Sequence, residues 1–289
     1  GGATGIEVAG ILSEMKKFVL PNDYPDMPSS LMHIYLIEAG PRLLAGMSEE
    51  SSAHAEQFLR EMGVNILLNK RVVDYRDHKV VLEDGTEIAT RTFIWVSGVT
   101  GVTIGNLDAS LIGRGGRIKV DSFNRVEGMN NVFAIGDQCI QLADENYPNG
   151  HPQLAQVAIQ QGELLAKNLV RMEKGREMKP FHYRNLGSMA TVGRNRAVAE
   201  FSKVKMQGWF AWVMWLVVHL RSILGVRNKV IVLLNWVWNY FTYDQSMRMI
   251  VYARKAKEIR DREKVEETTH WGKELVQEEK NPSTTSSSK

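Results

Sequence analysis

The first five residues, Gly-Gly-Ala-Thr-Gly, have the spacing of a backbone turn that binds phosphate. In a G-x-G-x-x-G turn the second glycine lets the backbone approach a pyrophosphate, and the third packs the following helix on a strand. Gly2 and Gly5 fit these two positions, and apolar residues at helical spacing predict a helix over 4–18 whose free N–H groups would face the phosphates. The first glycine and its strand would precede Gly1, so we expect an amino-terminal part to be missing.

An acidic residue follows the next predicted strand. The apolar run at 34–37 ends at Glu38. At the carboxyl end of such a strand, a carboxylate accepts hydrogen bonds from an adenosine ribose and repels a 2′-phosphate. Glu38 lies further from the glycine turn than the usual interval of about 20 residues, so residues 21–28 are interpreted as an inserted loop. A solvated glutamate in a turn is the alternative.

A second candidate turn lies in the middle of the chain. The apolar run at 131–135 leads into Gly136 and Asp137. Open α/β sheets bind ligands at the carboxyl ends of their strands, where Gly136 would allow a close approach and Asp137 would accept from a ribityl hydroxyl of a flavin. Gly98, just after a predicted strand at 93–96, would let backbone lie close to a flat ring. A generic strand-end turn is the alternative for the Gly-Asp pair.

Glutamines are concentrated in the apolar helix that follows this turn. The helix is predicted to open near Pro152, and Gln156 and Gln160 are four residues apart on one face. An uncharged, hydrogen-bonding face near a helix N-terminus suits the carbonyl of a flavin or of a quinone. Polar residues on a solvated surface would show the same spacing.

The order of these elements predicts an α/β protein of two Rossmann-like, dinucleotide-binding domains, as in two-dinucleotide flavoproteins. A second amphipathic helix is predicted over 49–62. Short β-like runs separated by turn residues predict a meander inserted into the doubly wound sheet, at 65–68, 71–75, 79–82 and 93–96.

Composition fits a globular chain with room for two domains: 289 residues, of which 44% are hydrophobic and 24% charged, with a net charge of +3. A lone cysteine, Cys139, excludes an internal disulfide and a cysteine pair for redox or metal chemistry within this sequence. It suits a reducing compartment. Neither a metal site nor a nucleic-acid partner is predicted.

The carboxyl-terminal part changes character. Residues 208–220 and 230–243 carry no charged side chain, and five of the seven tryptophans lie between Trp209 and Trp238. Both runs are shorter than the roughly 18 residues that span a bilayer. Residues 203–257 hold nine Lys and Arg against one acid, so the Trp-rich runs predict amphipathic helices that anchor in a membrane interface through residues 209–243. A buried packing hairpin is the alternative.

Taken together, these segments resemble the type II NADH:quinone dehydrogenases, single-subunit peripheral flavoenzymes of respiratory membranes. The resemblance extends from Gly1 to about Ala253 and includes a run, Ala-Gln-x-Ala-x-Gln-Gln, that is specific for the quinone site of that family. Its motifs here are Gly-Gly-Ala-Thr-Gly-Ile-Glu, Leu-Ile-Glu-Ala-Gly-Pro-Arg-Leu-Leu (36–44), Phe-Ala-Ile-Gly-Asp (133–137) and Ala-Gln-Val-Ala-Ile-Gln-Gln (155–161). Ser97 departs from the family, which often has alanine there.

The resemblance implies hydride transfer from NADH to a noncovalent FAD and reduction of a membrane quinone. It implies that Glu7 lies near the nicotinamide and that Ala155, Gln156 and Gln160 border the flavin and the quinone head group. It also implies a peripheral location on the cytoplasmic face of the inner membrane, and leaves a homodimer open. The expected divisions are an NADH-binding domain (1–97), the last part of an FAD-binding domain (98–180), a membrane-associating region (181–257) and a disordered charged tail (258–289).

Three other classes stay open at this stage. A disulfide reductase of the same fold needs a cysteine pair, which in many such enzymes lies upstream of this sequence. A sulfide:quinone oxidoreductase uses several cysteines, and only Cys139 is present. A membrane-surface module without catalysis is the third. The 289-residue chain by itself is expected to be inactive.

Overall fold

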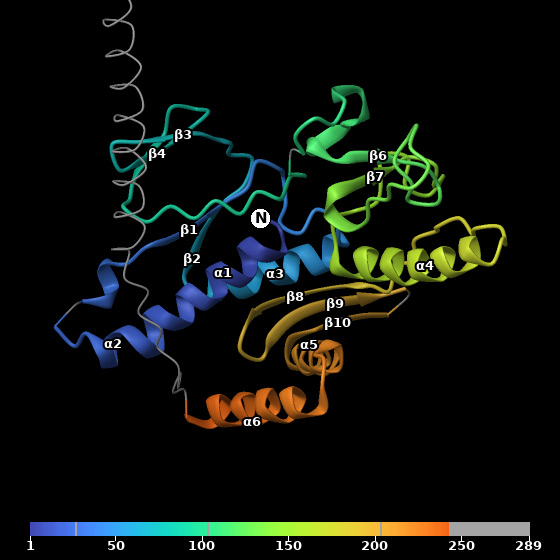
Figure 1. The fold of residues 1–289 in the computed structure, drawn as a ribbon. Coiled ribbons are helices and arrows are strands. Elements are labelled where there is room, and N and C mark those ends of the chain that lie inside the picture. Colours follow the sequence, from blue (N-terminus) through green and yellow to red (C-terminus); the bar gives the residue numbers. More distant parts are fainter. Residues whose placement is uncertain (27, 103, 203, 243–289) are drawn as a thin grey trace, which may run out of the picture. The chain divides into compact units, whose positions relative to one another are not determined.

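The computed structural model describes residues 1–26, 28–102, 104–202 and 204–242 (Figure 1). The chain divides into two compact units, Gly1–Val232 and Leu233–Lys289. The predicted disordered tail, and residues 243–257 of the predicted membrane-associating region, lie outside the described residues. The fold below is that of the first unit, and the last helix is described by itself.

The amino-terminal body has a parallel pair of strands with helices beside it. Its elements are α1 (Ala3–Glu14), a π-helical turn (Met15–Val19), α2 (Leu20–Asp23), a 3₁₀ turn (Ser29–Leu31), β1 (Ile34–Ile37), α3 (Glu49–Glu61) and β2 (Val64–Leu67). The helix after the glycine turn, the strand at 34–37 and the second helix are confirmed. The predicted loop at 21–28 instead begins inside α2, where Pro21 is tolerated because first-turn N–H groups have no helical partner. β1 and β2 pair with Ile34 opposite Val64, and apolar side chains of α1, β1, α3 and β2 share one core.

An antiparallel meander follows. Its strands are β3 (Val72–Arg76), β4 (Lys79–Leu82) and β5 (Glu87–Ala89), paired in the order β3-β4-β5. β3 and β4 were predicted, whereas β5 has too few residues to show an alternating pattern. The predicted strand at 93–96 is wrong. No described strand pairs with this segment, and Ile94 and Trp95 are 47% and 62% exposed, so neither a ladder nor burial holds it in a sheet.

The middle of the chain forms a smaller body. Its elements are 3₁₀ turns at Ala109–Leu111, Arg114–Gly116 and Gly136–Gln138, and the parallel strands β6 (Ile118–Val120) and β7 (Cys139–Gln141). The predicted strand at 131–135 is reduced to a single bridge between Arg125 and Phe133. The chain then turns directly into the 3₁₀ turn that carries Gly136 and Asp137, so the predicted Gly-Asp turn is present although its strand is not.

The long helix α4 (Ala155–Glu173) begins later than predicted. Leu154, its N-cap, is extended at φ −131° and ψ 145°, and no side chain caps the helix. Pro152 therefore lies outside the helix rather than in its first turn. Figure 1 shows α4 between the β6–β7 body and a carboxyl-terminal sheet.

That sheet was not predicted. It has the order β10-β9-β8, from β8 (Ser188–Gly193), β9 (Arg196–Phe201) and β10 (Val204–Gln207), and is followed by α5 (Gly208–Ser222). Ala211 of α5 is buried against Ala197 and Ala199 of β9. On the other side α1 lies against β8 so closely that a Cβ at Gly10 would be 2.3 Å from the Val192 carbonyl oxygen. Only glycine permits this contact, so α1 and β8 form one packed unit.

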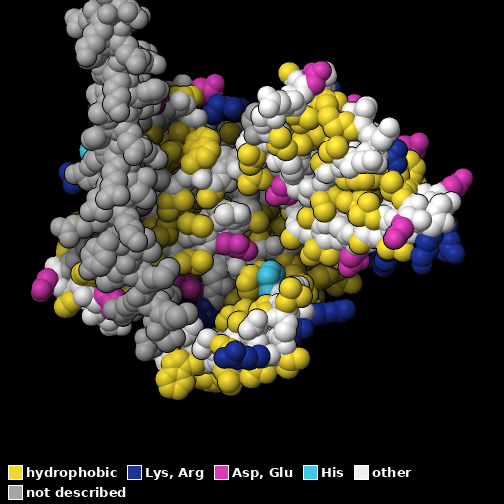
Figure 2. Space-filling model, viewed as in Figure 1, with side chains coloured by type: hydrophobic (Ala, Val, Ile, Leu, Met, Phe, Trp, Pro, Cys, Tyr) yellow, Lys and Arg dark blue, Asp and Glu magenta, His cyan; other side chains and the backbone are white. Residues whose placement is uncertain are grey.

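The last described helix is α6 (Val226–Thr242), and the two uncharged runs are thus confirmed as helices as far as they are described. None of the residues described in α6 is buried, and Val226 and Phe241 are 79% and 76% exposed. Among the described residues, no helix is both long and apolar enough to cross a membrane. Figure 2 shows hydrophobic side chains over much of the face in view.

Candidate functional site

The glycine turn and Glu38 lie side by side. Glu38 follows β1; its Oε2 is 2.8 Å from the Gly1 nitrogen, and its Oε1 accepts a hydrogen bond of 2.7 Å from the Gly40 N–H. Burial raises the pKa of this carboxyl, while hydrogen bonds from the Gly40 and Ala39 N–H groups lower it. The two halves of the predicted dinucleotide site are therefore neighbours in space.

The N-terminus of α1 is accessible. Gly2 is its N-cap without a side-chain cap, and a Cβ at Gly2 would meet nothing within 4 Å. Gly5 is buried, and a Cβ there would touch Val96 Cγ2 at 3.4 Å, an ordinary van der Waals distance. Gly2 therefore leaves the start of α1 open, and Gly5 lies near Leu36 of β1, while the tightest packing of the helix is at Gly10, further along α1.

Glu7 reaches from α1 to the carboxyl-terminal sheet. Its Oε1 is 3.5 Å from both the backbone nitrogen and the hydroxyl of Thr191 in β8. Burial raises the pKa of Glu7, while Thr191 and the nearby His219 of α5 act in the opposite direction. A carboxyl group with a raised pKa keeps its proton more readily than an exposed glutamate does.

The Gly136-Asp137 turn is attached to α4 by amide side chains. Gly136 has φ +65°, and a Cβ there would lie 3.2 Å from Ala158 Cβ, so glycine is required for both conformation and space. Gln161 Oε1 accepts from the Gly136 N–H at 2.7 Å, and Gln153 Nε2 donates to the Asp137 carbonyl at 3.0 Å. The Asp137 side chain itself is exposed.

Two further predicted residues are also open. Gly98 has φ +96°, and a Cβ there would meet nothing within 4 Å. Ala155 is the first residue of α4 and is exposed. Neither position is filled by a neighbouring side chain that would block a flat ring.

Gln156 and Gln160 bind backbone. Gln156 Nε2 donates to the Gly187 carbonyl at 2.9 Å and its Oε1 accepts from the Leu186 N–H at 3.0 Å. Gln160 makes the same pair of bonds with Arg184, at 2.9 and 3.1 Å. Both amides thus hold the segment that leads into β8, a role that the sequence did not indicate.

β8 connects the two sides of the site. Gln156 of α4 holds Gly187 just before the strand, and Glu7 of α1 contacts Thr191 within it. Four residues of extended chain span about 13 Å. The predicted nicotinamide-side and quinone-side residues are therefore attached to one short stretch of backbone.

A buried hydrogen-bonded pair of side chains in the same region was missed from the sequence. His151 Nε2 is 3.0 Å from Asp144 Oδ2, and their side chains are 4% and 2% exposed. Burial opposes the charge on Asp144, but hydrogen bonds from His151 and from the N–H groups of Asn146 and Tyr183 keep the pKa of Asp144 below its usual value. The pair lies in a loop, where no helical or strand spacing could reveal it.

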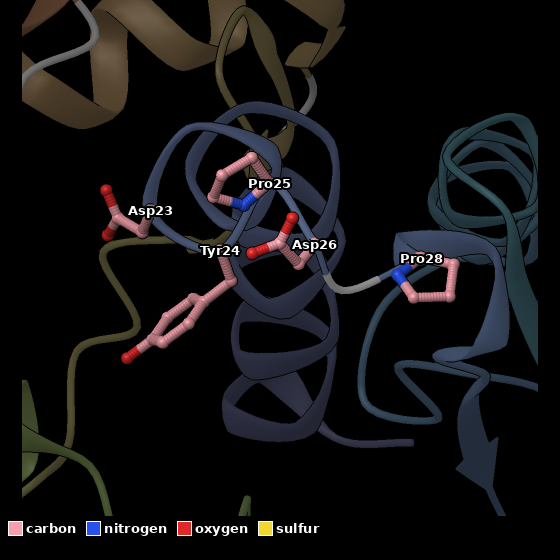
Figure 3. Close-up of a pocket in the computed structure, with 5 residues that line it drawn as sticks. All are labelled: Asp23, Tyr24, Pro25, Asp26 and Pro28. Carbon is pink, nitrogen blue, oxygen red and sulfur yellow. The ribbon is translucent and has the colours of Figure 1, made fainter.

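No part of the site coincides with the surface pocket of Figure 3, which lies in the loop after α2. That pocket is formed by Asp23, Tyr24, Pro25, Asp26 and Pro28. Its carboxylates belong to one exposed stretch, and among the described residues no group of three or more His, Cys, Asp or Glu side chains is placed to hold a metal ion.

The residues present fit a dinucleotide and a flavin. The uncapped helix end at Gly2 offers N–H groups to phosphates, and Glu38 offers a carboxylate beside it. The Gly136 turn is a cradle that a Cβ would disturb, with the exposed carboxylate of Asp137 next to it. Each feature has a polar or open face left for a ligand.

Comparison with known proteins identifies the class. Residues 1–162 match the family model of the pyridine nucleotide-disulphide oxidoreductases, and the chain belongs to this family. Residues 185–243 match a second model, the NDH2 C-terminal domain. The two matches on one chain confirm the resemblance to the type II NADH:quinone dehydrogenases.

Similar proteins agree with this assignment. NdhA of Mycobacterium tuberculosis, a type II NADH:quinone oxidoreductase, is 35% identical over 248 residues, which make up 81% of this chain and 51% of NdhA. The mitochondrial internal alternative NAD(P)H-ubiquinone oxidoreductase A1 of Arabidopsis thaliana is 31% identical over 83% of this chain and 50% of its own length. The chain thus spans about half the length of the curated relatives it matches.

Solved structures confirm the α/β fold. The structure of NDH2 from Plasmodium falciparum in complex with NADH has a TM-score of 0.74 and 18% sequence identity with this chain. The alignment covers 86% of this chain and 66% of that one.

Proposed function

We propose that this chain works as part of an FAD-dependent enzyme that passes electrons from NADH to a membrane quinone. The observation that carries the proposal is the attachment of Glu7 and Gln156 to the same stretch around β8, at Thr191 and Gly187. Flavin, when bound, would accept a hydride from NADH and give two electrons to the quinone. The names of the Mycobacterium tuberculosis and Arabidopsis relatives support this choice.

The chain's own residues would bind and orient NADH on one side. Gly2 and Gly5 would present the start of α1 to the pyrophosphate, and Glu38 would accept from the adenosine ribose hydroxyls. Glu7 would lie beside the nicotinamide. Because the pKa of Glu7 is raised, its Oε1 is suited to hold or move a proton that quinone reduction consumes.

On the flavin side, Gly136 would allow close approach and Asp137 would accept a hydrogen bond from the ribityl chain. Gly98 and Ala155 would leave room for the ring. Gln156 and Gln160 would border the quinone head group, and the four hydrogen bonds that they make would fix the wall formed by the segment before β8.

Flavin spectroscopy tests the activity. The full-length protein, purified with its flavin, should lose its visible flavin absorbance on addition of NADH and regain it on addition of a quinone in the absence of oxygen. Gln156→Ala should slow reoxidation by quinone more than reduction by NADH in a stopped-flow measurement, because Gln156 contacts the segment before β8. Wild-type flavin that NADH bleaches but quinone does not reoxidise would contradict the proposal.

We also infer that the protein is peripheral on the cytoplasmic face of the inner membrane and attaches through residues 209–243. The exposed apolar side chains of α5 and α6 support this, as do Arg221, Arg227 and Lys229 beside them. Each cation near anionic headgroups contributes about 1 kcal/mol. The fraction of protein that sediments with vesicles containing anionic lipid should therefore be lower for the double variant Arg227→Gln, Lys229→Gln than for the unsubstituted protein. Equal binding to neutral and anionic vesicles would argue against a role of these cations.

A further inference from the structure

The buried loop before α4 contains a polar cluster in an aromatic environment. His151 and Asp144 form a hydrogen-bonded pair, and the rings of Tyr147, Phe181 and Tyr183 lie 5.2 to 5.9 Å from the His151 ring. His151 Nδ1 and the Tyr183 hydroxyl are buried and have no hydrogen-bond partner among the described residues. The cluster thus combines a buried charge with two unsatisfied polar atoms.

Such a cluster is a poor source of stability. Removing a carboxylate such as that of Asp144 from water carries a large desolvation cost, and in many proteins apolar residues of similar volume stabilise as well as or better than a buried polar pair. Each unsatisfied polar atom adds a further desolvation cost. The hydrogen bonds of His151 and Asp144 therefore contribute mainly by fixing the positions of the chain segments that they join, and not by adding net stability.

The hydrogen bonds join three pieces of chain. Asp144 Oδ2 accepts from His151 Nε2 at 3.0 Å and from the Tyr183 N–H at 3.3 Å. Arg117, beside β6, donates to the His151 carbonyl at 2.9 Å. These hydrogen bonds therefore fix three parts of the chain at one point: the β6–β7 body, the loop before α4 and the segment from Tyr183 to β8.

The Asp144–His151 cluster lies next to the hydrogen bonds that the glutamine side chains of α4 make. Tyr183 directly precedes Arg184, whose backbone is held by Gln160, and His151 lies four residues before Ala155, the first residue of α4. No side chain caps α4, so its first turn is held by the Gln156 hydrogen bonds and by the packing of Val157 in one cluster with Phe181 and Tyr183. Movement of the cluster would shift the start of α4 against the segment before β8.

We propose that Asp144 and His151 are positioning residues for the quinone side of the site, acting through Gln156 and Gln160 on the segment before β8. The proposal rests on the proposed function of this chain. It concerns the quinone side and not NADH binding, since none of the hydrogen bonds involved reaches Gly2, Glu38 or Glu7.

The test uses the full-length, flavin-loaded protein and a soluble short-chain quinone. His151→Leu removes the donor to Asp144, whereas His151→Gln keeps an N–H at a similar reach. Asp144→Asn keeps the side-chain volume and serves where His151→Leu does not fold. Asn168→Ala is the matched control: Asn168 is also buried and also binds backbone from α4, at Lys179, but it lies far along the helix from Gln156.

We expect His151→Leu to raise the KM for quinone about tenfold, a smaller loss than the roughly 100-fold that a misplacement of about 1 Å can cause, with the rate of flavin reduction by NADH unchanged. Asp144→Asn should raise the KM less, and His151→Gln should restore it to near the wild-type value. Asn168→Ala should lower the melting temperature but leave the quinone KM unchanged.

The inference would be overturned, and a purely structural role shown, by either of two results. One is an equal quinone KM in His151→Leu and Asn168→Ala, and the other is equal slowing of flavin reduction by NADH and flavin reoxidation by quinone in His151→Leu. A wild-type protein that NADH reduces but no quinone reoxidises would overturn the proposed function and this inference together. A quinone-active wild type with unaffected Asp144→Asn and His151→Leu variants would overturn the inference alone.

Discussion

Glu38 should decide between NADH and NADPH. The change is Glu38→Gln, which removes the charge of the side chain. It keeps an oxygen that can accept the hydrogen bond from the Gly40 N–H, which is 2.7 Å from Glu38 Oε1 in the unsubstituted chain. The side chain is 26% exposed and next to the Gly1 nitrogen. A 2′-phosphate on the adenosine ribose would bring a second negative charge close to the carboxylate.

The magnitude follows from Coulomb's law. Two unit charges about 4 Å apart interact by about 1 kcal/mol in water and about 2 kcal/mol at an effective dielectric constant of about 40, which suits a partly exposed side chain. Glu38→Gln should therefore lower the preference for NADH, measured as kcat/KM for NADH divided by kcat/KM for NADPH, by about 5- to 30-fold.

The assay is steady-state kinetics of the full-length protein with each nucleotide at fixed quinone. Glu50→Gln serves as a matched control, since Glu50 is exposed and pairs with Lys205 on another surface. A ratio that Glu38→Gln leaves unchanged, or a wild-type protein with equal kcat/KM for both nucleotides, would refute the reasoning.

Three other substitutions probe different parts of the structure. The pKa of Glu7 is raised by folding, so its favourable contribution to the free energy of unfolding is present in acid and is lost as the pH rises through the folded-state pKa. Glu7→Gln should flatten this decline in urea unfolding measured across that pH range; an unchanged slope would assign the decline to other groups. Asp137→Ala should remove one charge-assisted hydrogen bond, about 1.5–3 kcal/mol, and yield protein with depleted flavin by absorbance ratio; full occupancy would leave the turn a structural role. Gly10→Ala would place a Cβ 2.3 Å from the Val192 carbonyl oxygen and should cost about 1–3 kcal/mol in denaturant unfolding; wild-type stability would mean that α1 separates from β8 without loss.

The sequence predicted those parts of the fold that depend on local pattern. The strand at 34–37 and the helix at 49–62 have clear periodicity, and both are present. The strand predicted at 93–96 failed because apolar composition alone does not provide a ladder partner. The sheet β8–β10 was missed although β8 and β9 are longer than β1, since its strands are recognised mainly by their pairing and by their contact with α1.

In the candidate site too, features that depend on local sequence could be predicted, and those that depend on contacts between distant residues could not. Gly136 and Glu38 could be selected from sequence because each follows an apolar run, where a glycine permits a close approach and a carboxylate accepts hydrogen bonds. The pairing of Gln156 and Gln160 with backbone could not, because an amide in a sequence does not reveal which of its possible partners it meets. The link between Asp144 and His151 depends on the course of a loop, which neither helical nor strand periodicity describes.

Amide side chains of α4, together with Gln153 just before the helix, make this segment intolerant of a change in length. Gln153 and Gln161 hold the Gly136-Asp137 turn, while Gln156 and Gln160 hold the segment before β8. Inserting or deleting one residue within α4 between Gln156 and Gln161 would rotate everything beyond it by about 100° and shift it by about 1.5 Å, so the two sets of bonds could not survive together. Relatives of this chain should therefore differ in length before Gln153 or beyond Gln161, and chimeras should be joined there.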